Sequence, residues 1–162
     1  MNSKCLRIKI TVGETSVQVE AKTAMELATT TTTTRLLSPL FKLPPRTIKI
    51  LAFSIAMANK MAAWNERRLI RDIYDIWFFC RMNVRPDEEA LKKRLLKPAY
   101  SRLAKKSAYF KGLSTEDFYD MIRNYCALLT DADIEEELSD YLPPGEITGL
   151  SDMFRAAFAN LR

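Results

Sequence analysis

The sequence predicts an α+β protein in which a small β portion precedes a helical portion. Segments that alternate polar with apolar residues and are rich in β-branched side chains all fall before residue 52, as is typical of strands. From Phe53 onward, apolar residues recur at helical spacing and several helix starts follow. We therefore expect a β portion over residues 1–52 and a helical portion over residues 53–162.

Composition limits the functional classes. A hydrophobic content of 48% and a charged content of 28% in 162 residues are those of an ordinary globular protein. No apolar run approaches the roughly 20 residues of a membrane span, and charges interrupt the N-terminus where a signal peptide would be apolar. These features favour the cytoplasm and exclude a membrane partner.

The cysteines and the absence of histidine exclude further chemistry. Cys5, Cys80 and Cys126 are far apart, and the chain has no histidine. A zinc site and any histidine-dependent acid–base mechanism are therefore excluded.

The charges are segregated along the chain. Residues 67–111 hold thirteen basic and five acidic side chains, whereas residues 112–162 hold three basic and eleven acidic ones. The basic block indicates either a face for an anionic partner such as RNA or a surface that pairs with the acidic block inside the protein.

Three strands and one polar run are expected in the β portion. Residues 6–12 and 16–20 alternate on either side of a short turn at residues 13–15 and predict a hairpin. An isolated hairpin is only marginally stable, so we expect it to pack on helices or on the strand Thr47–Leu51. The threonine run 29–34 predicts a loop or an exposed edge strand.

Two successive helices are expected over residues 53–81, with a break or kink at Asn65. At about 100° per residue, one side of this segment is apolar. The opposite side carries a set of mostly charged residues: Lys60, Trp64, Arg67, Arg71 and Asp75.

The rest of the chain predicts a bundle of short helices. Residues 86–89 are an acidic helix start, and residues 100–110 carry a basic helical pattern. Helices are further expected from Ser114, over the acidic residues 131–141, and over residues 151–161.

The charged side of residues 60–75 has two interpretations. It is either a solvated helix face with a weak Arg71–Asp75 pair, or a site where lysine and arginine bind phosphates and aspartate supplies a hard oxygen ligand for Mg²⁺. The spacing Lys-x-x-Ala-x-x-x-Arg-x-x-x-Arg-Asp-x-x-Asp runs from Lys60 to Asp75. This segment resembles the AbiEii/AbiGii nucleotidyltransferase toxin family, most closely over residues 48–81, and favours the second interpretation.

The resemblance implies a function and a role for each residue. It implies transfer of a nucleotide from an NTP to RNA, tRNA among the candidates, with Mg²⁺ and within a toxin–antitoxin or phage-defence system that includes a cognate antitoxin. Lys60 would contact the triphosphate, and Asp72 would be the acidic catalytic partner. Arg67 and Arg71 would neutralise phosphates of the nucleotide or RNA, and Asp75 would orient Arg71.

The chain departs from the family's pattern ahead of the lysine. The resemblance implies a Gly-Ser motif and an Asp-x-Asp metal pair ahead of the lysine, and neither precedes Lys60. The one Asp-x-Asp, Asp131-Ala132-Asp133, is expected to be an acidic helix start. We therefore expect residues 1–52 to be a partial nucleotidyltransferase β portion and the chain to be a C-terminal part that is inactive alone. The alternative is a non-enzymatic helical module that binds nucleic acid or a protein partner.

Overall fold

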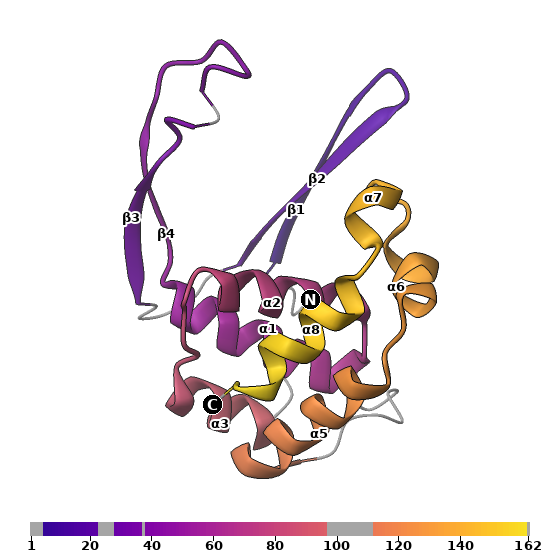
Figure 1. Cartoon of the computed structure of the whole chain (residues 1–162). Coiled ribbons are helices and arrows are strands. Elements are labelled where there is room, and N and C mark those ends of the chain that lie inside the picture. Colours follow the sequence, from indigo (N-terminus) through magenta and orange to yellow (C-terminus); the bar gives the residue numbers. More distant parts are fainter. Residues whose placement is uncertain (1–4, 23–27, 37, 97–111, 162) are drawn as a thin grey trace.

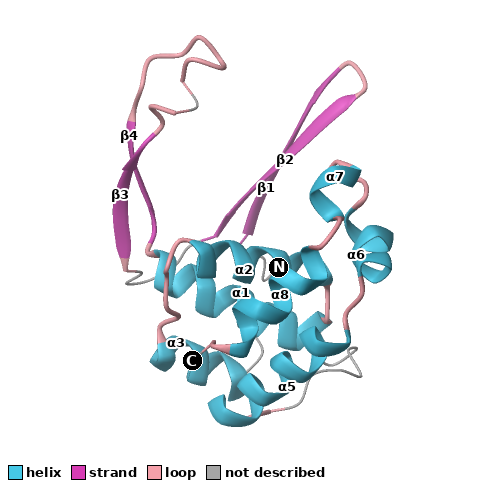
Figure 2. Cartoon of the chain, in the orientation of Figure 1, coloured by secondary structure: helices cyan, strands magenta, loops and turns pink. Residues whose placement is uncertain are grey.

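The computed structural model describes residues 5–22, 28–36, 38–96 and 112–161. It confirms the α+β class, because two hairpins precede a helical portion (Figures 1 and 2). The strands are β1 (Cys5–Val12), β2 (Thr15–Lys22), β3 (Thr29–Thr33) and β4 (Thr47–Leu51), and the helices are α1 (Phe53–Arg67), α2 (Ile70–Arg81), α3 (Glu88–Leu96), α5 (Thr115–Leu128), α6 (Asp131–Leu138), α7 (Pro144–Ile147) and α8 (Leu150–Ala159). The basic helical pattern expected over residues 100–110 lies outside the described residues.

Each pair of consecutive strands forms its own antiparallel hairpin. β1 pairs with β2 in a register that places Val12 opposite Thr15, with a two-residue turn between them. Gly13 opens this turn at φ 60°, a conformation that glycine adopts without steric cost. The threonine strand β3 pairs with β4, with Thr29 opposite Leu51, so of the two expected states, loop or exposed edge strand, the run forms the edge strand over Thr29–Thr33.

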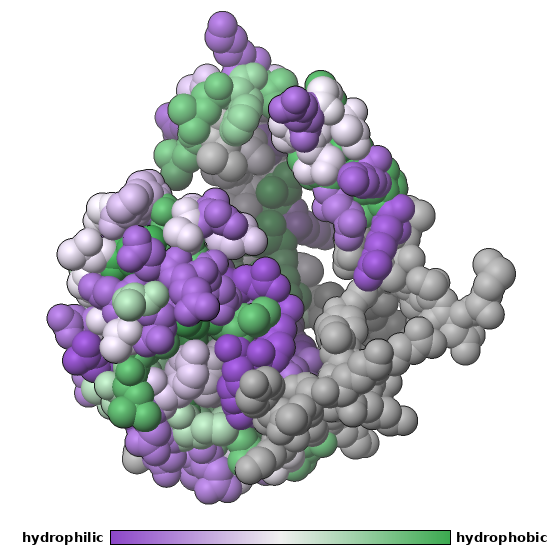
Figure 3. All heavy atoms as spheres, turned by 90° about the vertical axis from the view of Figure 1, so that its right-hand side faces the viewer, coloured by the Kyte–Doolittle hydropathy of each residue, from purple (hydrophilic) through white to green (hydrophobic). Residues whose placement is uncertain are grey.

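The two hairpins project from the same side of the helical portion (Figure 1). The first hairpin has one aliphatic face, since the pairs Ile8–Val19 and Ile10–Val17 lie side by side, and these side chains remain 46–57% exposed. In Figure 3, hydrophobic surface is visible on the segments that project above the helices. Of the two expected partners of the β1–β2 hairpin, helices or β4, the strand β4 is not one, because the described strands form two separate two-stranded sheets.

A break between α1 and α2 sets the geometry of the charged segment. It lies at Arg68 and Leu69, three residues beyond the expected position at Asn65. Arg68 adopts the left-handed conformation at φ 56°, and its amide donates to the carbonyl of Trp64. Its guanidinium also lies 4.3 Å from the centre of the Trp64 ring, a cation–π contact that stabilises the turn.

The core lies among the helices. α1 contributes Met57, Met61 and Trp64 to it, and α2 contributes Ile73 and Ile76, all without exposed surface. Trp64 lies at helical spacing between Lys60 and Arg67, as expected for the charged side, but its ring is buried because it packs against Phe118 and Tyr125 of α5. A core residue therefore interrupts the charged side of α1.

Side chains cap the starts of the later helices, at Ser114 as expected for α5. Ser114 accepts the amide of Asp117 at the start of α5, and Thr130 forms a capping box with Asp133 at the start of α6. Asp87 accepts the amide of Ala90 near the start of α3. These caps fix the turns between short helices that bury their apolar faces against α1 and α2.

Candidate functional site

Asp72 lies at the centre of the charged segment. Its carboxylate is fully buried in the first turn of α2, and it accepts two hydrogen bonds of 2.7 Å from the Nε and Nη2 atoms of Arg67. This two-pronged pair is the strongest form of arginine–carboxylate recognition. The bonds to Asp72 raise the pKa of the Arg67 guanidinium above its ordinary value, so Arg67 stays charged.

Lys60 joins the same carboxylate from α1. Its Nζ atom lies 3.8 Å from Oδ1 of Asp72 and also pairs with Oδ2 of Asp75. The side chains of Lys60 and Arg67 remain 41% and 42% exposed, respectively. Carboxylates therefore hold the charged groups of Lys60 and Arg67 in place, while a large part of each side chain remains exposed to solvent.

The structure confirms the expected placement of the predicted site residues on two helices that follow a strand. β4 leads into α1, which carries Lys60 and Arg67, and α2 carries Asp72 and Asp75. The Arg71–Asp75 pair was expected, but among the described ion pairs Asp75 bonds Lys60 instead. Asp75 is therefore placed to orient Lys60.

Arg71 lies at the start of α2 with an exposed side chain. Its backbone amide and that of Ile70 donate to the carboxylate of Glu137 on α6, at 3.1 and 2.8 Å. These are amides of the first turn, which lack partners inside the helix. Glu137 thus caps α2 from another helix and fixes the turn that carries Asp72. Sequence reasoning missed this residue, because it lies 66 positions from Arg71 and no local capping pattern indicates it.

One member of the basic block is used inside the protein. Arg94 on α3 donates to Asn59 at 2.6 Å and to the buried carboxylate of Glu66 at 3.0 Å, both on α1. Lys93 pairs with Glu89 on its own helix. Arg94 therefore fastens α3 to α1, while Lys92 and Lys93 are exposed.

The described carboxylates do not fit a magnesium site. Both oxygens of Asp72 accept from Arg67, and the nearest further carboxylate in this cluster, Asp75, pairs with Lys60. A divalent cation requires several oxygen ligands that are not already bound to cations. Within the described residues, no group of three or more candidate metal ligands occurs.

The Asp-x-Asp sequence has a structural role instead. Asp131 accepts the amides of Gly149 at 2.6 Å and Ser151 at 2.9 Å, at the start of α8. Asp133 accepts the amide and hydroxyl of Thr130 in the capping box of α6. These bonds hold the pKa of both carboxyl groups below the usual value. The expectation of an acidic helix start is confirmed.

The fold and the charged cluster define the class: an α+β protein with cations grouped around a buried aspartate at a helix–helix turn. The chain belongs to the nucleotidyl transferase AbiEii toxin family of type IV toxin–antitoxin systems, since the model of this family matches residues 2–159. An antitoxin partner and a nucleotide substrate follow from this membership. No curated protein and no solved structure matches the chain. No described helix has the length and apolar character needed to cross a membrane.

Proposed function

We propose that the chain binds the triphosphate of an NTP for nucleotide transfer to RNA, through Lys60, Arg67 and Arg71. The observation that carries this proposal is the cluster on Asp72, which holds Lys60 and Arg67 in place while leaving both cations open to solvent. An arginine fork and a lysine point charge are the two side-chain types that bind phosphate best. The family membership of residues 2–159 supports a nucleotide as the anion.

Each residue has a distinct role in this proposal. Lys60 and Arg67 contact phosphate oxygens with the donors that Asp72 and Asp75 do not occupy. Asp72 takes part in transfer by fixing both cations before the nucleotide arrives, which lowers the entropic cost of binding. Arg71, which is exposed beside the turn, contacts the phosphates of the nucleotide or of the RNA acceptor.

Binding and transfer are separable. Mg²⁺ supplies charge neutralisation on the phosphates in this class of reaction, but Asp72 and Asp75 are bound to cations, and Asp131 and Asp133 cap helices. We therefore expect the purified chain to bind NTP without transferring label from any of the four NTPs to total RNA. In this proposal, transfer needs carboxylates that come from outside the described residues.

The test is equilibrium binding of each NTP to the purified chain, measured by displacement of a fluorescent analogue. Loss of one charge-assisted contact costs about 1.5–3 kcal/mol, so Lys60→Ala should weaken binding roughly 10- to 100-fold. Lys93→Ala is the matched control, because Lys93 is also an exposed lysine paired with a carboxylate. Equal affinity of wild type and Lys60→Ala for all four NTPs would contradict the proposal.

A further inference from the structure

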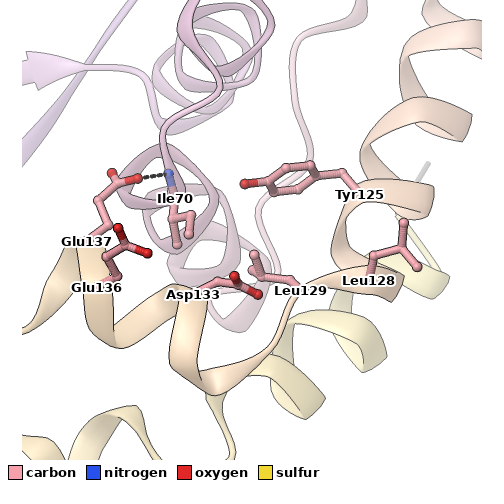
Figure 4. A pocket seen from close by; sticks show the side chains of 7 residues that line it. All are labelled: Ile70, Tyr125, Leu128, Leu129, Asp133, Glu136 and Glu137. Carbon is pink, nitrogen blue, oxygen red and sulfur yellow. Dashed lines mark hydrogen bonds between the residues drawn. The ribbon is translucent and has the colours of Figure 1, made fainter.

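A cavity of about 550 Å³ lies between α5, α6 and the start of α2. Its lining, shown in Figure 4, combines one aromatic, three aliphatic and three acidic residues: Tyr125, Ile70, Leu128, Leu129, Asp133, Glu136 and Glu137. This volume is that of a site for a small ligand or for one or two side chains. The cavity contains none of the residues assigned above to the nucleotide.

The lining favours a cation on an apolar stem. The ring of Tyr125 extends from α5 toward the side of the cavity where Glu137 lies, with Ile70 between them (Figure 4). The aliphatic side chains and the ring face offer contact area for methylene groups, and the ring face also attracts a positive charge. The carboxylates provide acceptors for an ammonium or guanidinium group, and the described residues that line the cavity include no lysine or arginine.

The three carboxylates differ in what they already do. Glu137 caps α2, and Asp133 caps α6. The side chain of Glu136 is exposed, and no described hydrogen bond or ion pair ties it to the fold. Glu136 is therefore the acidic group in the cavity that a ligand can engage without releasing a helix cap.

The surroundings point to a protein segment as the ligand. Leu128 at the cavity edge is 82% exposed, which leaves apolar area outside the cavity for a partner to cover. Residues 112–162 hold eleven acidic and three basic side chains, and Arg123 and Arg155 each pair with an aspartate on their own helix. This segment therefore carries a net negative charge, which attracts a basic partner.

We propose that the cavity binds a lysine or arginine side chain of a basic segment of a partner protein, with an apolar neighbour of that side chain covering Leu128. The segment places its cation beside Glu136 and its methylene stem against Tyr125 and Leu129. This site is separate from the nucleotide cluster and does not depend on the proposed function.

The test uses the full chain labelled with ¹⁵N and an acetylated peptide of sequence Gly-Lys-Leu-Lys-Leu-Gly. We expect saturable shifts of the backbone amides of Leu128 and Leu129, and none with a peptide in which glutamate replaces lysine. Because like charges repel at a contact, Glu136→Lys should raise the Kd of the basic peptide at least about tenfold.

The matched control is Glu135→Lys, since Glu135 is exposed on the same helix but does not line the cavity. It makes the same charge change and should alter the Kd less than about threefold, because exposed charges that are not in contact are screened. Equal weakening by both variants would show a general charge effect and overturn the proposal. Displacement of the peptide by spermidine at equal concentration would assign the cavity to a small amine instead, and no shift at several millimolar peptide would also overturn it.

Discussion

Replacing Asp72 with asparagine should destabilise the protein more than any other single change in the charged cluster. Asp72 is fully buried and accepts two hydrogen bonds from the guanidinium of Arg67, and the Nζ atom of Lys60 lies 3.8 Å from its Oδ1 atom. Removal of one partner of a buried pair costs about 3–5 kcal/mol, but Arg67 and Lys60 can regain water because they are partly exposed, so we expect roughly 2–3 kcal/mol. For a protein of this size that corresponds to a fall in Tm of about 4–12 °C.

The assay is urea unfolding at pH 7 followed by circular dichroism, with Asp75→Asn as the comparison. Asp75 pairs with Lys60 at the surface, both side chains being 41% exposed, and such a pair contributes about 0.2–1 kcal/mol. The two variants have the same chemistry, so their difference isolates burial. A loss below about 1 kcal/mol for Asp72→Asn, equal to that of Asp75→Asn, would refute the central role of Asp72.

Further predictions concern the basic block, acid stability and cysteine reactivity. Replacing Lys92 and Lys93 with alanine should lower the salt slope of RNA binding by up to roughly two units, one per phosphate contact, in filter-binding titrations from about 50 to 200 mM salt. Arg94→Met should instead reduce the free energy of unfolding by roughly 2–4 kcal/mol, since it removes the guanidinium that bonds the buried carboxylate of Glu66. The amides at the start of α8 hold the pKa of Asp131 below its ordinary value of 3.8. The contribution of Asp131 to stability is therefore present above about pH 4 and is lost as the pH falls further. In urea unfolding measured from about pH 6 to pH 3, Asp131→Asn should reduce the fall of the midpoint concentration at acid pH. Burial raises the pKa of Cys126 to about 12, so iodoacetamide at pH 8 should modify it only after unfolding, as mass spectrometry of the native and denatured protein can show.

Patterns within a few consecutive residues correctly predicted several strand and helix boundaries. The change from alternation to helical spacing near residue 52 located the end of β4 and the start of α1, and Ser114 located the start of α5. The interpretation of Asp131-Ala132-Asp133 as a helix start was also correct, because capping depends on residues within one turn. The motif from Lys60 to Asp75 predicted that Lys60 and Asp72 lie close together, but it did not predict the ion pairs, since Asp75 bonds Lys60 rather than Arg71.

Long-range pairings were not predictable in the same way. Glu137 caps α2 across 66 positions, and Arg94 reaches Glu66 across 28. No periodicity in the sequence indicates which carboxylate meets which donor after the helices pack. The separate hairpins were missed for a related reason, since an alternating segment indicates a strand but leaves its neighbours in the sheet undetermined.

The break between α1 and α2 brings the charged residues of the motif together in space. In an unbroken helix, Arg67 and Asp72 would point about 140° apart, and Lys60 and Asp75 would lie roughly 22 Å apart along the axis. The left-handed conformation of Arg68 turns the chain so that α2 packs back against α1, which brings these residues close together. Arg67 then forms its fork with Asp72, and Lys60 meets Asp75. The contact of Arg68 with Trp64 holds the turn, so the charged cluster depends on a stacking interaction in the core beneath it.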